Sequence, residues 1–300
     1  MTIAVLGATG FIGRALVPAL AERGEVVAVS RRGDAGERDG VRAVAADVTD
    51  ATSVREALEG VDIVYYLVHS LGSPGYAELD RRAATTVARE AGNAGVEQIV
   101  YLGGLGDDHP DLSPHLRSRL ESAAALSSGS VPVTTLRAAV VIGRGSAGFE
   151  TIVALVDRLP AMVAPRWISA PTQPIALGDV IRYLTGVAGN AGAIGERFDA
   201  GGPEILTYRH MIERIARLRG RRPLIVEVPV LSPRLSSYWL HLVTPVRAGV
   251  ARPLVEGLRN PTVARDDRIR ELLPFPLTPF DDAARAALSA AVDREVVSGG

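Results

Sequence analysis

The chain has 300 residues, of which 47% are hydrophobic and 22% are charged, so it can form a large core and is not a disordered protein. Its formal net charge of −1 argues against nucleic-acid binding through overall charge, and the lack of cysteine excludes disulfides, zinc–thiolate sites and a cysteine nucleophile. All 33 basic residues are arginine, which also excludes any mechanism that requires lysine.

No basic stretch marks the N-terminus as a secretion signal, and no apolar run reaches the roughly 20 residues of a membrane-spanning helix. We therefore expect a cytoplasmic protein without an integral membrane segment. The histidines have no metal-ligand spacing, which predicts that the protein has no metal site. The oligomeric state is open.

Short apolar runs alternate with helical stretches in the first part of the chain, which is typical of βαβ units around a buried parallel sheet. We expect strands at 3–6, 26–30, 41–46, 62–68, 98–102 and 133–142, and helices at 12–23, 51–59, 76–91 and 115–126. After this point we expect a helix at 149–158, a return to the sheet at 175–188 and 197–200, a helix at 208–219 and a strand at 224–228. The rest of the C-terminal third is expected to be helical.

These elements predict a doubly wound parallel Rossmann sheet, an α/β fold, with a smaller and mainly C-terminal cap. We expect residues 1–200 to form the nucleotide-binding domain and residues 201–300 to form a substrate-binding cap. The insertion at 144–174 is expected to contribute to the pocket.

A glycine motif lies directly between the first expected strand and the first expected helix. Its spacing favours dinucleotide binding: one glycine allows the turn, the second admits a pyrophosphate, and the third lets the helix pack on the strand. The N–H groups at the start of the helix then face the anion. The predicted cofactor contacts of this turn are Gly7, Thr9, Gly10, Phe11, Ile12 and Gly13.

The end of the second strand indicates which nucleotide binds. It carries Ser30, Arg31 and Arg32, where proteins that bind NAD place an acidic residue. A hydroxyl and two guanidinium groups suit the 2′-phosphate of NADP(H), which arginine can bind bidentately. After the third strand, Asp47 and Val48 are expected to meet the adenine, although a helix N-cap or turn role for Asp47 is an open alternative.

The fourth strand is expected to end near His69. Because open α/β sheets bind ligands at the carboxyl ends of their strands, His69 is a candidate contact for the cofactor or the substrate. The alternative is a buried histidine or one that is hydrogen-bonded to the backbone.

Several further segments share the pattern of one superfamily. They are 136–143, 174–180 and 198–207 and, in a narrower subgroup, 101–106, 112–121 and 165–167. With the glycine motif, the first three resemble the atypical, extended branch of the short-chain dehydrogenase/reductase superfamily. The narrower set resembles bacterial NAD(P)H-binding proteins akin to NmrA-like regulators and to the NDUFA9-type subunit of respiratory complex I. The resemblance implies a Rossmann fold, NADP(H) as the cofactor and oxidoreductase chemistry.

The chain departs from this superfamily at its catalytic motif, Tyr-x-x-x-Lys, because no tyrosine here has lysine or arginine four residues later. At the equivalent helix, His115 and Arg119 have the same spacing and share one face. The superfamily's serine after the fifth strand is replaced by Gly103 and Gly104. In one interpretation His115 is the general acid or base and Arg119 holds the ribose and phosphate of the cofactor. In the other, His115 is an exposed helix-start residue and the site is inert.

The resemblance also implies that the segments around Glu150, Arg166–Trp167 and Gln173 cover the nicotinamide. Glu150 is a candidate proton donor, and its alternative is an ordinary carboxylate in the first turn of a helix. The apolar segment 237–243 is either core or the lining of a pocket for a bulky, apolar substrate.

The leading hypothesis is an NADP(H)-dependent oxidoreductase that acts on an apolar carbonyl or enone-type small molecule. His115, Arg119 and Glu150 are its catalytic candidates. One alternative is a non-catalytic NADPH-binding sensor or assembly protein. Another is a redox-neutral enzyme, such as a dehydratase or cyclase, that re-uses the fold.

Overall fold

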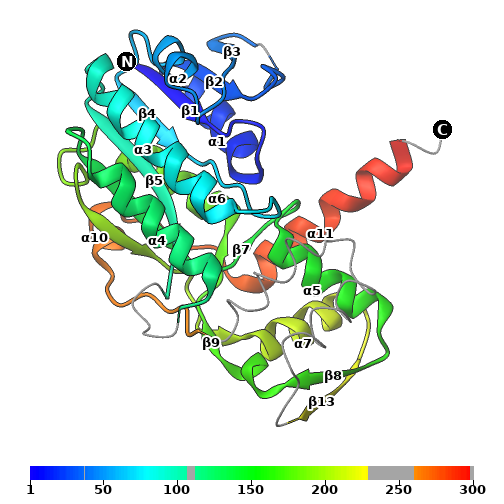
Figure 1. Cartoon of the computed structure of the whole chain (residues 1–300). Helices are drawn as coiled ribbons and strands as arrows, with labels where there is room; N and C mark the ends of the chain where they lie inside the picture. The colour runs from blue at the N-terminus through cyan, green and yellow to red at the C-terminus, as the bar shows by residue number, and fades with distance from the viewer. Residues whose placement is uncertain (37, 107–111, 229–259, 298–300) are drawn as a thin grey trace.

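Seven short apolar runs form one parallel sheet in the computed structural model, which describes residues 1–36, 38–106, 112–228 and 260–297 (Figure 1). The strands are β1 (Thr2–Leu6), β2 (Glu25–Ser30), β3 (Val41–Ala45), β4 (Ile63–Tyr66), β5 (Gln98–Gly104), β6 (Val133–Ala138) and β11 (Arg197–Ala200). Their order is β11-β6-β5-β4-β1-β2-β3, and every neighbouring pair is parallel. The predicted doubly wound Rossmann sheet is confirmed.

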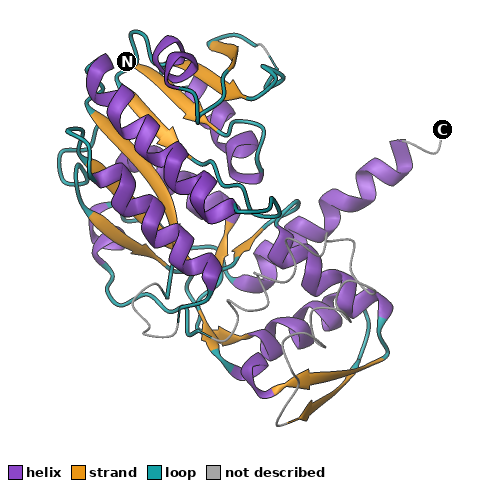
Figure 2. Ribbon diagram, in the orientation of Figure 1, coloured by secondary structure: helices purple, strands orange, loops and turns teal. Residues whose placement is uncertain are grey.

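Helices cover both faces of this sheet (Figure 2). One face is covered by α1 (Phe11–Ala21) and α6 (Leu177–Val187), and the other by α2 (Ala51–Ala57), α3 (Tyr76–Ala94) and α4 (Pro114–Ser127). Successive strand residues point to opposite faces, so Val5 packs in the first layer and Leu6 in the second. Both side chains are fully buried, which explains why the strand is apolar throughout.

Local signals fix where α4 begins, and α4 carries His115. The hydroxyl of Ser113 accepts the N–H of Leu116 at 3.3 Å and caps the helix, and Pro114 occupies the first turn, where it displaces no hydrogen bond. The preceding helix, α3, ends at Gly95, whose φ of 74° lies in the left-handed region. His115 is therefore held in the first turn of a capped helix.

Two predicted strands are wrong in part. The expected strand 133–142 leaves the sheet after Ala138, and its last residues form β7 (Val141–Ile142), which pairs with β10 (Ile175–Ala176) outside the main sheet. The segment 175–188 is mostly the helix α6 rather than a strand of the sheet. The buried apolar residues of α6 are Val180, Tyr183, Leu184 and Val187. These residues repeat with the period of a helix and not of a strand, which explains why the segment is helical.

A second group of elements forms the smaller lobe, most of which is seen below the sheet in Figure 1. It contains α5 (Ala147–Arg158), β8 (Ala161–Pro165), a 3₁₀ helix (Arg166–Ser169), β9 (Pro171–Thr172), β12 (Leu206–Thr207), α7 (Tyr208–Leu218), β13 (Leu224–Val228) and α11 (Phe280–Val297). Its core joins α5, α7 and the first turns of α11 through Phe149, Met211 and Phe280. Between these parts of the chain, α10 (Arg268–Leu272) returns to the sheet, where Ile269 packs in the Rossmann core.

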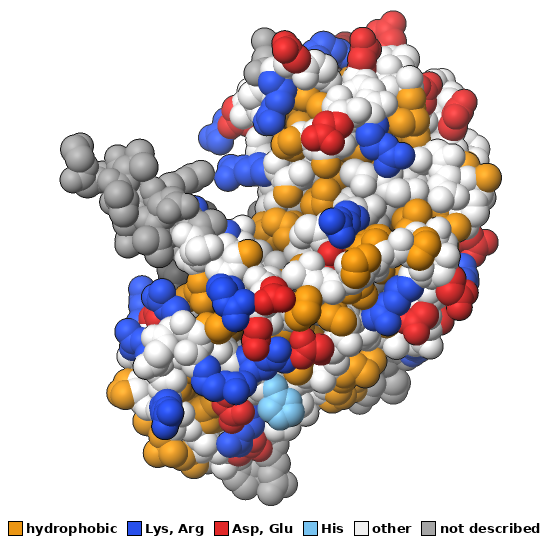
Figure 3. Space-filling view, turned by 180° about the vertical axis from the view of Figure 1, so that it is seen from behind, with side chains coloured by type: hydrophobic (Ala, Val, Ile, Leu, Met, Phe, Trp, Pro, Cys, Tyr) orange, Lys and Arg blue, Asp and Glu red, His pale blue; other side chains and the backbone are white. Residues whose placement is uncertain are grey.

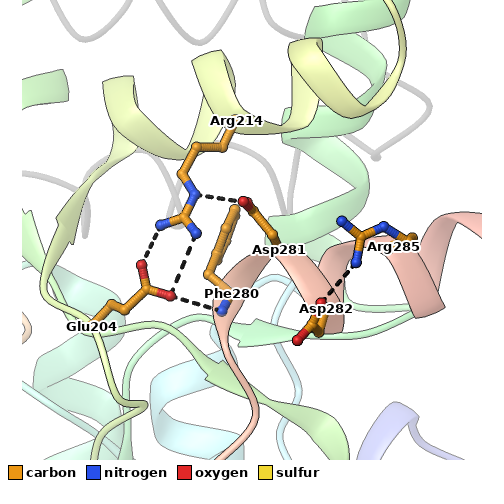
Figure 4. A network of polar contacts seen from close by, with 6 residues as sticks. All are labelled: Glu204, Arg214, Phe280, Asp281, Asp282 and Arg285. Atoms are coloured by element: carbon orange, nitrogen blue, oxygen red, sulfur yellow. Dashed lines mark hydrogen bonds and ion pairs between the residues drawn. The ribbon is translucent and has the colours of Figure 1, made fainter.

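A polar cluster fixes α7 against the start of α11 (Figure 4). The guanidinium of Arg214 donates to Asp281 at 2.7 Å, pairs with Glu204, and lies 5.1 Å from the centre of the Phe280 ring. Glu204 also accepts the N–H of Phe280 at 3.0 Å. The Arg214 side chain is 17% exposed and pairs with two carboxylates, so these charges form a network rather than an isolated surface salt bridge. The smaller lobe thus has a polar cluster beside its own core.

Acidic and basic side chains are intermixed over the face shown in Figure 3. Ion pairs between opposite charges occur on the surface of the described residues, for example Arg209 with Glu227 at 2.7 Å and Arg219 with Asp157 at 2.8 Å.

Candidate active site

The glycine turn after β1 has the geometry expected of a dinucleotide-binding turn. Gly7 has a φ of 92°, and its carbonyl accepts the N–H of Gly10 at 3.0 Å. A Cβ added at Gly13 would lie 2.3 Å from the carbonyl oxygen of Gly7 and 2.8 Å from Ala8. No side chain fits there, so the packing role predicted for Gly13 is confirmed.

The outer side of the same turn is open. A Cβ added at Gly10 would meet only the oxygen of Gly7 within 4 Å, at 3.2 Å. Gly10 is the N-cap of α1, no side chain caps this helix, and its first turn holds no acidic residue. Thr9, Phe11 and Ile12 are half-buried around this point. The uncapped start of an eleven-residue helix beside open space suits a pyrophosphate.

The end of β2 brings together Ser30, Arg32 and a third residue, Asp34. The hydroxyl of Ser30 donates to Asp34 at 2.8 Å, and Nε of Arg32 donates to the other oxygen of Asp34 at 2.9 Å. These two partners lower the pKa of the Asp34 carboxyl, with Ser30 the larger influence. Gly33, at a φ of 67°, allows the tight turn that returns Asp34 to the strand end. The sequence analysis did not include Asp34 among the site residues, although Gly33 was a signal for the turn.

Arg31 and Asp47 lie at the same edge of the sheet. Two hydrogen bonds from Thr49 lower the pKa of Asp47, and the charges of Arg82 and of the exposed Arg31 add to this effect. Those bonds run from the N–H and the hydroxyl of Thr49 to one oxygen of Asp47, both at 2.8 Å. The structure therefore shows the turn role of Asp47, while Asp50 caps α2. Contact of Asp47 and the half-buried Val48 with adenine stays a prediction.

The structure brings His69, His115 and Arg119 together. His69 follows β4, His115 lies in the first turn of α4, and Arg119 lies one turn later. Burial of His115, with the nearby charge of Arg119 and the His69 ring, lowers the pKa of its imidazole to about 4. His69 keeps contact with solvent, but the protein atoms that crowd its ring, and then Arg119, lower its pKa to about 4 as well. Both imidazoles are therefore neutral at neutral pH.

Arg119 is held firmly by protein atoms. One of its terminal nitrogens donates to the carbonyl of Leu102, and the guanidinium lies 4.9 Å from the centre of the Tyr101 ring. The Tyr101 hydroxyl in turn donates to the backbone carbonyl of Arg119 at 2.9 Å. This anchoring places the positive charge at the end of β5, beside the histidines. Binding of the cofactor ribose by Arg119 stays a prediction.

A buried carboxyl supports the loop that carries His69. Asp80, on α3, is 3% exposed and accepts the backbone N–H of Ser70, the residue after His69, at 2.7 Å. Burial raises the pKa of Asp80, although the Ser70 hydrogen bond and the Arg119 charge oppose the rise. The sequence analysis missed Asp80. Its place on the apolar face of α3, three residues before the buried Ala83, was the available signal.

The residues expected to cover the nicotinamide have other roles where they are described. Glu150 accepts the N–H of Gly145 at 3.0 Å in the first turn of α5. This is the role of an ordinary first-turn carboxylate, the alternative to proton donation. Gln173 is buried and joins the carbonyl of Gly202 at 2.7 Å to the N–H of Ala264 at 2.9 Å. The segment 237–243 lies outside the described residues, as do the side chains of residues 166 and 167.

Two glycines at the end of β5 stand where the superfamily places a serine. A Cβ at Gly104 would lie 3.2 Å from the side chain of Leu116, and one at Gly103 would lie 3.3 Å from the Tyr101 ring. Packing of α4 and Tyr101 thus takes the space of a side chain at both positions. No hydroxyl stands at these positions to assist His115.

Residues 7–142 match the family described as NAD(P)H-binding. The matched residues include the glycine turn, the strands β2 to β7 and the helix α4 that carries His115. The chain is 27% identical to a (4-alkanoyl-5-oxo-2,5-dihydrofuran-3-yl)methyl phosphate reductase of Streptomyces griseus, over 93% of this chain and 95% of the relative. It is 29% identical to a chloroplastic divinyl chlorophyllide a 8-vinyl-reductase of Oryza sativa, over 76% of this chain and 61% of that protein.

Two further comparisons bear on the predicted resemblance. A mitochondrial NADH dehydrogenase [ubiquinone] 1 alpha subcomplex subunit 9 of Arabidopsis thaliana is 23% identical over 75% of this chain and 60% of its own, which confirms the predicted likeness. An Escherichia coli NADPH-dependent quinone oxidoreductase, solved with NADPH, superposes with a TM-score of 0.77 at 19% identity, covering 96% of this chain and 99% of its own. The last likeness shows a shared fold.

Among the described residues, no helix is both long and apolar enough to cross a membrane. Within the same residues, the histidine and carboxylate side chains form no group of three or more that is placed to hold a metal ion.

Proposed function

We propose that the protein is an NADPH-dependent reductase of a conjugated, electron-poor small molecule. The observation that carries this proposal is the pair of neutral histidines, His69 and His115, beside the end of β5 in an NAD(P)H-binding domain. The glycine turn would hold the pyrophosphate, and Ser30, Arg31 and Arg32 would hold the 2′-phosphate.

When bound, NADPH supplies a hydride, which is two electrons and one hydrogen. An isolated ketone that accepts hydride places a full negative charge on one oxygen, and a positioned general acid must give that oxygen a proton. A conjugated acceptor spreads the charge, and its oxygen needs only a hydrogen bond before a proton from water completes the reduction. A neutral imidazole can provide such a bond through its N–H, so His115 fits the second reaction better than the first.

The charge of Arg119 has two effects in this site. It favours a neutral form of His115, and it favours negative charge that develops nearby on the substrate. The names of two similar proteins, the Streptomyces griseus and Oryza sativa reductases, describe the reduction of a dihydrofuranone and of a vinyl group. Both names support an unsaturated acceptor rather than a simple ketone.

The reaction is tested by following NADPH absorbance with three acceptors of similar size: a cyclic enone, a quinone and a saturated ketone. We expect turnover with the first two, and transfer of deuterium from NADPH deuterated at C4 into the product, read by mass spectrometry. Turnover of the saturated ketone alone would contradict the proposal. Binding of NADPH with no consumption by any acceptor would favour the sensor or assembly alternative.

Cofactor preference is tested by fluorescence titration with NADPH and NADH. We expect tighter binding of NADPH, and Arg31→Ala should weaken it by about 1.5–3 kcal/mol because charge-assisted hydrogen bonds to the phosphate are lost. Arg217→Ala, which removes an exposed arginine of α7, is the matched control and should change nothing. Equal affinities of the wild-type protein for the two nucleotides would refute this assignment.

A further inference from the structure

The expected phosphate subsite already holds an anion that belongs to the protein. Asp34 accepts the hydroxyl of Ser30 at 2.8 Å, and its backbone N–H donates back to that hydroxyl oxygen at 3.2 Å. Arg32 binds the same carboxylate with two nitrogens, Nε at 2.9 Å and a terminal nitrogen at 2.8 Å. Two of the three side chains that would hold the 2′-phosphate are therefore occupied by a carboxylate.

A carboxylate and a phosphate compete for such donors because both are anions that accept charge-assisted hydrogen bonds from arginine. A phosphate that enters must displace Asp34 or lie beside it with a like charge. The Arg32 and Asp34 side chains are 84% and 42% exposed, so the internal pair is weak enough for a ligand to displace it. NADH carries a hydroxyl at this position and meets no such repulsion.

We propose that Asp34 competes with the 2′-phosphate for Ser30 and Arg32 and thereby limits the preference of the site for NADPH over NADH. This inference rests on the proposed function, in which Ser30, Arg31 and Arg32 form the phosphate subsite. Asp34 acts here as a specificity-determining residue. Arg31, which is exposed and influences Asp47 rather than Asp34, supplies the attraction that remains.

The test is Asp34→Asn, which removes the charge and keeps the shape of the side chain. We expect it to strengthen NADPH binding roughly three- to tenfold and to leave NADH binding no stronger, measured by fluorescence titration at low ionic strength. Free 2′-AMP, measured by calorimetry, should show the same gain, while 5′-AMP should not. Asp39→Asn removes another exposed carboxylate of the same lobe and should change neither nucleotide's affinity.

A third variant distinguishes the proposed phosphate subsite from the proposed competition by Asp34. Arg32→Ala should weaken NADPH binding and leave NADH binding unchanged. If Arg32→Ala weakens NADPH binding but Asp34→Asn leaves it unchanged, the phosphate subsite stands and the competition by Asp34 is refuted. If neither variant alters NADPH binding, both the subsite and the inference are wrong. An equal gain for NADPH and NADH in Asp34→Asn would show a general charge effect and would also overturn the inference.

Discussion

The candidate site lies along the carboxyl ends of the sheet strands, and its two ends differ in the groups that form them. At β1 and β2, backbone geometry and glycine dominate: the turn requires no side chain at Gly13 and leaves open space at Gly10. At β4 and β5, the site depends on the side chains of His69, His115 and Arg119, which come from two separate segments of the chain.

The difference reflects two requirements: binding a dinucleotide, which is general, and suiting one kind of substrate, which is particular. Any dinucleotide presents a pyrophosphate, so a backbone turn serves all of them and remains visible as a glycine pattern. In the proposed function the reacting end must suit one kind of substrate, and there the chain has neutral imidazoles and an anchored guanidinium in place of a tyrosine and a lysine. The following tests treat the two ends separately.

The largest effects are expected in the glycine turn, where one substitution should destabilise the protein and a similar one should abolish NADPH binding. Gly13→Val places carbon atoms where the Cβ alone would lie 2.3 Å from the Gly7 oxygen, so it should destabilise the protein by roughly 3 kcal/mol or more. Gly10→Val points into open space, so it should leave a folded protein that no longer binds NADPH. Thermal unfolding by circular dichroism and fluorescence titration separate these outcomes. NADPH binding by folded Gly10→Val would show that the turn is structural only.

At the other end, His115→Phe removes a hydrogen-bond donor and keeps the size and packing of a ring. We expect turnover to fall roughly 10²-fold, the usual cost of losing one donor to a developing negative charge, with NADPH affinity unchanged. His210→Phe, an exposed histidine on α7, is the matched control. Full activity of His115→Phe would exclude His115 and leave His69 as the candidate donor.

The sequence predicted the sheet well because its signals are local. Apolar runs bounded by glycine gave six strands of the sheet their approximate places, and 197–200 was identified as a later one. The prediction was wrong at 141–142 because these residues pair with β10, which is distant in the sequence, and at 177–187 because the helical period of the apolar residues was overlooked.

The candidate site was predictable only where its residues are close in sequence. The spacing of His115 and Arg119 was visible from the sequence, but their approach to His69 depends on the pairing of β4 with β5. Asp34 and Asp80 have sequence signals, Gly33 for the turn and the apolar face of α3, but these signals do not identify the partners, Ser30 and Ser70.

A smaller effect is expected from acid. The pKa of His115 is about 4 in the folded protein against 6.5 in the unfolded chain, so the unfolded chain binds more protons between these values. Stability should therefore be complete above pH 6.5 and fall as the pH approaches 4. Urea unfolding at pH 7 and pH 4.5 should show a loss that is about 1–2 kcal/mol smaller in His115→Phe. Turnover should not titrate near pH 6.5, and a rate that falls above that pH would indicate a charged histidine as the acid.

The smallest effect is expected from Glu150, the remaining candidate proton donor. Its carboxylate accepts the N–H of Gly145 at the start of α5, a role that glutamine can also fill through its amide oxygen. Glu150→Gln should therefore change turnover less than about threefold, whereas a general acid would cost roughly 10²–10⁴-fold. Glu150→Ala is the companion variant: it should lower the melting temperature slightly, because the Gly145 N–H loses its partner. A large loss of turnover in Glu150→Gln, with unchanged melting temperature and NADPH affinity, would move proton transfer from α4 to α5. The contrast between the two ends would then remain, but the reacting end would include α5 of the smaller lobe.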